Sequence, residues 1–406
     1  MEPFTVGRTM KLGALPYHED VARHLQTGEA ALWSWFESDQ FSQRYADRVK
    51  LELLKSTYRL TRADHADFYA LADTAAEKLS LDLPVTVYQS HGVNGEANAA
   101  LVFLPDEAAL TLNGNIGDLL SEEEMLAVFG HELSHHRLYS LDSGNYFTAE
   151  RLLDWCAAQP GCEDPILETG RLYRLHSEIY ADMGALRVTG DRDAVISSLI
   201  KVSTGLKSVN PLSYLEQTEE ILENRREGSD GLTHPELHIR AKALDLLSGK
   251  APKLRALTDL VRGPLDAKRL DLLGQRSLSG AIRRVIDSVL APAFMRGEYA
   301  ANLASRYFED FELSDGGAEA GLAELAAEIA PFAKSCHDAL AYVLLDFATA
   351  DPDGGDIALT WTLDVADRLG LFSVYEPLVR KELKRKKEAI SKLRRGAQPN
   401  GKTNHA

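Results

Sequence analysis

The sequence is poor in the features that mark secreted and nucleic-acid-binding proteins. Its 406 residues include only three cysteines, Cys156, Cys162 and Cys336. They form no disulfide framework and no CxxC pair, so a reducing compartment is expected. Lysine and arginine number 45 against 61 aspartates and glutamates, a net charge of -16. A general nucleic-acid-binding protein needs a basic face, so no nucleic-acid partner is expected.

Long apolar runs are missing as well. Residues 1–20 contain no apolar core of a signal peptide. No segment approaches the roughly 18 uninterrupted apolar residues of a membrane-spanning helix, and the longest apolar run of the C-terminal half ends at Asp346. We therefore expect a cytoplasmic protein without an integral membrane segment.

The residues that are present predict a mainly helical α+β fold. Hydrophobic residues make up 45% of the chain, and the length predicts two or three domains. From Pro84 onward, short alternating segments separated by turn residues predict two or three strands. We expect an N-terminal helical segment at 1–50, a domain with the small sheet at 51–250, a helical domain at 251–395 and a disordered tail at 396–406.

The segment EEEMLAVFGHELSHHRLYSL contains a histidine pair. Ser121 and Glu124 form a capping-box pattern that predicts the start of a helix. His131 and His135 are four residues apart and therefore point the same way, an arrangement in which two imidazoles can hold one zinc ion. Glu132 lies at the edge of that face, where it can reach a metal-bound water as a general base. The alternative is a chance HExxH in an ordinary helix.

A catalytic zinc also needs a third protein ligand and an open position. Leu138 and Leu141 exclude the arrangement in which a third histidine follows the pair. The segment LHSEIYADMGALRV offers Glu178 and Asp182, again four residues apart on one helical face. Glu178 can complete the ligand set, while Asp182 can accept a hydrogen bond from a ligating histidine and fix its tautomer. The alternative is a solvated helical face, which the apolar neighbour Ile179 disfavours.

The two motifs, HELSH followed by EIYAD, resemble metallopeptidase family forty-eight, which includes the CAAX prenyl endopeptidases and the heat-shock protease HtpX. The similarity extends to THPELHIRAKAL and covers roughly residues 51–250. It implies a zincin-like (gluzincin) domain that hydrolyses peptide bonds. The histidine pair and Glu178 would bind one Zn²⁺ per chain. Glu132 would be the catalytic base, and Asp182 would accept a hydrogen bond from a ligating histidine. The lack of membrane spans departs from the best-known members and argues against a prenylated or membrane-integral substrate.

Two further assignments depend on this resemblance. The element THPELHIR implies that His234 donates to the oxyanion and that Arg240 contacts the substrate or braces the helix of Glu178. The alternatives are a helix cap and a surface ion pair. The segment NAALVF is expected to be an edge strand that pairs with a peptide substrate, with Asn98 and Ala99 at its start. An inner strand is the alternative.

The C-terminal third carries no motif of comparable strength. Residues 339–372 are faintly similar to the helical TerB-like domain of tellurite resistance. Residues 380–395 hold nine Lys/Arg and two Glu, a local net charge of +7. For this run we favour either a helix end that docks on the acidic remainder of the protein or a solvated helix face. Both are favoured over an anchor for nucleic acid or a membrane. The favoured function of the whole chain is a zinc metalloendopeptidase acting on peptides or proteins. The alternative is a binding or regulatory module that keeps the metal as a structural element.

Overall fold

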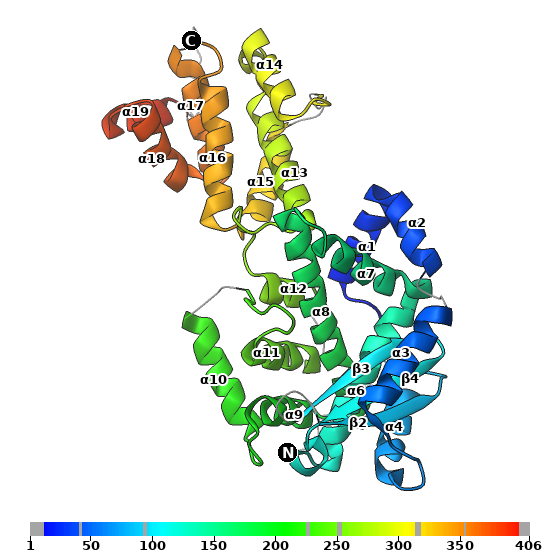
Figure 1. The fold of residues 1–406 in the computed structure, drawn as a ribbon. Helices are drawn as coiled ribbons and strands as arrows, with labels where there is room; N and C mark the ends of the chain where they lie inside the picture. The colour runs from blue at the N-terminus through cyan, green and yellow to red at the C-terminus, as the bar shows by residue number, and fades with distance from the viewer. Residues whose placement is uncertain are drawn as a thin grey trace. The chain divides into compact units, whose positions relative to one another are not determined.

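A computed structural model of the chain (Figure 1) describes residues 12–39, 43–91, 96–224, 228–249, 254–312, 318–352 and 355–397. The chain forms two compact units, Met1–Gly263 and Pro264–Ala406. Helices predominate in both units, and within the described ranges the one sheet lies in the first unit. The predicted α+β class is confirmed at this level. No described helix is long and apolar enough to cross a membrane.

The helices of the first unit are α1 (Pro16–Gly28), α2 (Ala30–Asp39), α3 (Gln43–Ser56), α4 (Ala66–Leu79), α5 (Ile116–Leu119), α6 (Glu122–Ser140), the 3-10 helix η2 (Leu141–Gly144), α7 (Asn145–Ala157), α8 (Asp164–Thr189), α9 (Arg192–Thr204), α10 (Pro211–Asn224), α11 (Leu237–Ser248) and α12 (Leu254–Arg262). The boundary after α12 differs from the one expected at 250/251. Helix α12 packs on α1, α8 and α11 and buries Leu257 and Val261, so it belongs to the first unit.

The four strands of the sheet are β1 (Tyr58–Arg59), β2 (Val85–Ser90), β3 (Asn98–Leu104) and β4 (Glu107–Asn113), in the order β1-β2-β4-β3. Strands β2 and β4 are parallel, and β3 is antiparallel to β4. Strand β3 is therefore an edge of the described sheet, a position that the sequence left open. The three longer strands fall in the predicted segments, whereas β1 is too short to show an alternating pattern.

Helices cover both faces of the sheet. Ala46 and Leu53 of α3 pack on one face with Tyr88, Leu104 and Ala109. Helices α4 and α6 contact the strands as well. Side chains alternate between the two faces along a strand. The strand residues next to those that pack on α3 therefore point to the opposite face, where α6 lies. The sheet thus holds α6 in place, and α6 carries the histidine pair.

Helices α6 and α8 pack together along much of their length, and two glycines permit their close approach. A Cβ atom on Gly184 of α8 would lie 1.7 Å from Oγ of Ser134. A Cβ atom on Gly130 of α6 would lie 2.9 Å from Cβ of Val188. Real Cβ atoms are not found at such distances, so larger side chains at either glycine would force the helices apart.

The second unit is helical, with α13 (Leu272–Val289), the 3-10 helix η3 (Ala293–Met295), α14 (Glu298–Tyr307), α15 (Ala318–Ile329), α16 (Lys334–Ala348), α17 (Gly355–Arg368), α18 (Phe372–Glu382) and α19 (Lys387–Ala397). These helices surround a single apolar core. The structure thus shows a helical C-terminal unit, and its TerB-like character stays a prediction. Of the expected disordered tail, residues 398–406 lie outside the described residues, and residues 396–397 end α19.

The basic run at 380–395 contacts the second unit itself. Arg385 forms an ion pair with Asp356 at 2.7 Å, and Arg394 forms one with Asp367 at 2.7 Å. Both carboxylates belong to α17. The run therefore contacts α17 of its own unit through two ion pairs, while many of its other side chains are exposed.

Candidate metal centre

Three side chains from two helices converge in the first unit. His131 and His135 lie one turn apart on α6, whose start at Ser121 has the predicted capping box, and Glu178 lies on α8. Their ligand atoms are all within 4.8 Å of one another, and within the described ranges this group has three members. Nε2 of His131 is 3.4 Å from Oε2 of Glu178, and Nε2 of His135 is 3.4 Å from Oε1. The predicted ligand set is therefore assembled in space.

The distances within this group suit a metal ion better than hydrogen bonds. Charge-assisted N–H···O bonds are about 2.7–2.9 Å long. Ligand atoms at about 2.0–2.1 Å from a tetrahedral zinc are about 3.3–3.4 Å apart, close to the 3.4 Å found here. In addition, Oε2 of Glu178 is buried without a hydrogen-bond partner. A divalent cation between the three groups would give this oxygen a partner and leave a fourth position open.

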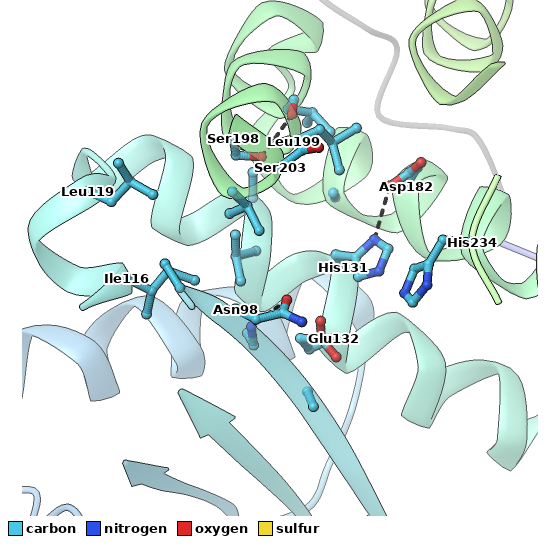
Figure 2. Close-up of a pocket in the computed structure, with 18 of the residues that line it drawn as sticks. Asn98, Ile116, Leu119, His131, Glu132, Asp182, Ser198, Leu199, Ser203 and His234 are labelled. Carbon is cyan, nitrogen blue, oxygen red and sulfur yellow. Dashed lines mark hydrogen bonds and ion pairs between the residues drawn. The ribbon is translucent and has the colours of Figure 1, made fainter. Parts of the chain in front are cut away.

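An ion pair supports His131 from behind. Asp182, which is fully buried, has Oδ1 3.0 Å from Nδ1 of His131 (Figure 2). Arg240 of α11 donates to both carboxylate oxygens of Asp182, at 2.6 and 2.8 Å. Asp182 thereby accepts a hydrogen bond from Nδ1–H of His131. This leaves Nε2 of His131 facing the other two ligands. Of the two roles open to Arg240 in the sequence, the structure shows the bracing one.

The same charges determine the protonation of the centre. Burial lowers the pKa of His131, but the carboxylates of Asp182 and Glu178 outweigh burial and raise it to about 10. Burial raises the pKa of Glu178, but the two imidazoles hold it well below its usual value. Burial also raises the pKa of Asp182. The guanidinium of Arg240, and to a smaller extent His131, outweigh burial and hold this pKa below its usual value. Without a metal, His131 is therefore protonated on Nε2 as well as on Nδ1. A cation bound at Nε2 would replace the Nε2 proton.

Glu132 and the start of β3 line the same cleft as the ligands, a cavity of about 1010 Å³. Glu132 is 9% exposed, and both Glu132 and Asn98 line the cleft (Figure 2). Strand β3 contributes Asn98, Ala99, Ala100 and Leu101 to the lining. The side chain of Asn98 accepts a hydrogen bond from the backbone N–H of Ala99 at 2.9 Å. The predicted base and the predicted substrate strand thus border one cavity.

His234 reaches the ligands from the loop before α11. Its Nε2 is 3.5 Å from Oε2 of Glu178, and its side chain is 58% exposed. Nδ1 lies 2.9 Å from the hydroxyl of Thr233. His234 and Arg240 both line the cleft, whereas His238 is not among its lining residues. The structure therefore brings His234 and Arg240 to the centre, as the resemblance implies.

The loop that carries His234 is clamped to α8, a feature that the sequence analysis missed. Arg171 of α8 donates from Nη1 to the carbonyl oxygens of Ser229 at 3.1 Å and Gly231 at 2.7 Å. Glu168 accepts from the remaining guanidinium nitrogens of Arg171, at 2.7 Å each. Glu236 accepts from the hydroxyl of Ser229 at 2.6 Å. One helix therefore carries the third ligand and also fixes this loop.

Two other histidines near the motifs have structural contacts. His136 is buried and donates from Nε2 to the carbonyl oxygen of Leu104 at 2.9 Å, which joins α6 to β3. His176 donates from Nδ1 to the carbonyl oxygen of Leu172 at 2.7 Å and stacks on Tyr17 with ring centroids 4.2 Å apart. Neither belongs to the ligand group.

The chemistry of the centre follows from its donor set. Two imidazoles and a carboxylate with an open position, next to a carboxylate that is not a ligand, are typical of a zinc ion that activates water. No family model, no curated protein and no solved structure matches the chain. The resemblance to a metallopeptidase family therefore stays a prediction, and the case for a metal rests on the geometry of the three ligands.

Proposed function

We propose that the first unit hydrolyses peptide bonds as a zinc-dependent endopeptidase. The observation that carries the proposal is the convergence of His131, His135 and Glu178 in an open cleft that Glu132 also lines. A structural zinc site is usually closed by a fourth protein ligand and has no use for a general base. The described part of the chain offers three ligands and a base, which favours catalysis.

Each residue of the centre has a distinct part in the proposed reaction. When bound, zinc would supply Lewis acidity toward water and a carbonyl oxygen. Glu132 takes the proton of the attacking water and delivers it to the leaving amine. His234, whose imidazole is exposed to the cleft, donates a hydrogen bond to the oxygen that becomes negative. Asp182 holds the tautomer of His131, and Arg240 holds Asp182.

The edge strand β3 would hold the substrate. Its residues from Asn98 to Leu101 border the cleft beside the ligand group, and an edge strand can add an extended peptide through backbone hydrogen bonds. Backbone pairing recognises an extended segment of almost any sequence. The substrate proposed here is therefore an extended stretch of a peptide or protein, and its path crosses the metal ligands.

The decisive experiment compares wild-type protein with the Glu132→Gln variant in zinc content and in cleavage of an unstructured peptide mixture. Both should carry about one zinc per chain, because Glu132 is not a ligand. Glutamine is nearly isosteric but cannot accept the proton, so turnover should fall about a hundredfold to ten-thousandfold. Glu123→Gln, an exposed position on the same helix, is the matched control. Full turnover by Glu132→Gln would overturn the mechanism.

Zinc analysis also tests the ligands. Glu178→Ala should lose most of the metal because it removes one of three ligands, whereas His176→Ala, two residues away on α8, should keep it. Full zinc occupancy in Glu178→Ala would contradict the assigned ligand set. Zinc in the wild type with no cleavage of any peptide would instead favour a binding or regulatory module.

A further inference from the structure

One end of the cleft carries a group of apolar side chains, with the polar residues Asp118 and Ser203 also in its lining. We call it the apolar recess and define it by six lining side chains, those of Ile116, Leu119, Val128, Val195, Leu199 and Val202. They belong to α5, α6 and α9, and none of them is in the ligand group. In the view of Figure 2, Ile116 and Leu119 lie to the left of His131, Leu199 lies above it, and His234 lies to its right.

The recess begins directly beside the metal ligands. Helices α6 and α8 run antiparallel. On α6 the chain runs from His131 to His135, and the residues that these contact on α8 come in the reverse order, Asp182 and then Glu178. Val128 precedes His131 by three residues on the same face of α6 and lines the cleft. One helical turn rises about 5.4 Å. The apolar wall therefore starts about one turn from the first ligand.

Helix α9 forms the opposite wall with a stripe of apolar side chains. Val195, Leu199 and Val202 have the spacing i, i+4 and i+7, which places them on one face. Such a stripe usually packs into a core, yet Leu199 and Val202 are only half-buried and line the cleft. Ser198, between them, uses its hydroxyl within the helix by donating to the carbonyl oxygen of Val195 at 2.8 Å. The wall thus presents apolar side chains over Val195–Val202, and Ser203 and Thr204 line the cleft at its end.

We infer that the apolar recess binds a large apolar side chain, such as that of leucine, methionine or phenylalanine, from the substrate residue next to the scissile bond. This inference rests on the proposed peptidase function. Along an extended peptide each residue advances about 3.3 Å and neighbouring side chains point to opposite sides, so a residue adjacent to the metal can reach the recess. A charged side chain would lose hydration against these six apolar side chains, which cannot form hydrogen bonds with it.

A binding experiment tests the recess without requiring turnover. The zinc-loaded Glu132→Gln protein is titrated by calorimetry with blocked pentapeptides Ala-Ala-X-Ala-Ala, in which X is Leu, Phe, Ala or Lys. The Leu and Phe peptides should bind at least about tenfold more tightly than the Ala and Lys peptides, the usual discrimination of an apolar pocket. Equal affinities for Leu, Phe, Ala and Lys would overturn the inference.

Variants of Leu199 locate the preference. In the same Glu132→Gln background, Leu199→Phe should fill the recess and abolish the advantage of the Leu and Phe peptides over Ala. Leu199→Ala should enlarge it and favour Phe over Leu. Leu212→Phe is the control, because Leu212 on α10 is 55% exposed and is not a lining residue. An unchanged preference in Leu199→Phe would contradict the recess as its source.

Cleavage by the wild type separates this inference from the proposed function. If the peptides bind with the expected preference but none is cleaved, the recess is supported and the peptidase proposal fails. If the Leu and Ala peptides are cleaved equally well, the peptidase proposal stands and the recess fails. When both hold, mass spectrometry should place the cut at a bond of residue X itself.

Discussion

In the second unit, the described residues that are buried are almost all apolar, and the buried polar ones are Asp271, Ser288 and Thr362. Asp271 caps α13 by accepting from the N–H of Gly274 at 2.8 Å. Ser288 and Thr362 donate to backbone carbonyl oxygens of their own helices. The contacts of Asp271 and Ser288 complete their helices, and the hydroxyl of Thr362 also lies 2.9 Å from that of Tyr375 on α18.

The first unit buries charge instead. Glu178, Asp182 and Arg171 are each at most 7% exposed, and Glu132 is 9% exposed. Burying an ionised group is costly unless partners surround it, and these residues are among those that line or support the candidate metal centre. The comparison indicates that the two cores differ in what they bury: the core of the second unit is almost entirely apolar, whereas that of the first unit holds charged groups at the candidate metal centre at a cost in stability.

The largest effect that distinguishes the units should come from removing Asp182. Asp182→Ala leaves Arg240, whose side chain is only 12% exposed, without the carboxylate that it pairs with at 2.6 Å, and breaking a buried pair in this way costs about 3–5 kcal/mol. Asp338→Ala in the second unit removes only the partner of Lys334, whose side chain is 76% exposed, so its cost should be at most about 1 kcal/mol. Chemical denaturation with a chelator present measures both values. Equal losses would remove the contrast.

The next effect concerns turnover rather than stability. His234→Phe should keep zinc and lose about a hundredfold or more in turnover, the usual cost of one oxyanion donor. His238→Ala, which changes a histidine on the following helix that does not line the cleft, should be close to wild type. A His234→Phe enzyme that works at full rate would remove this residue from the mechanism.

A smaller loss should follow when the clamp on the His234 loop is weakened. Arg171→Lys keeps the charge but cannot hold both carbonyl oxygens and Glu168 at once. Turnover should fall about ten- to a hundredfold through misplacement of His234, with zinc retained. Arg174→Lys, at a partly exposed pair with Asp154, is the control. In a His234→Phe background Arg171→Lys should cost nothing further, and an additional loss there would show a role unrelated to His234.

The smallest effect is expected at the surface of the second unit. Arg385 and Asp356 are 44% and 48% exposed, so Arg385→Gln should lower the free energy of unfolding by about 0.2–1 kcal/mol at low salt. At about 1 M salt, where the screening length is about 3 Å, the difference should nearly vanish. A melting temperature that does not respond to the substitution at either salt concentration would favour a solvated face for the basic run.

Parts of the fold and site could be predicted because they depend on local periodicity. The spacing of four residues places His131 over His135 and Glu178 over Asp182 whatever surrounds the helices, and strand alternation located β2, β3 and β4. The clamp was missed because Arg171 binds backbone carbonyl oxygens some 60 residues away, and no side-chain pattern records such a contact. The edge position of β3 and the unit boundary after α12 likewise depend on tertiary packing, which the sequence does not display locally.

Helix α8 joins these features mechanically. It is a single helix of 26 residues, about 39 Å long, and it carries the clamp residue Arg171, the ligand Glu178 and the close-contact residue Gly184. A regular helix is stiff over this length, so a displacement at one end is transmitted to the other. Any movement of α8 against α6 would therefore change the spacing of the ligands and the position of the His234 loop in a single step.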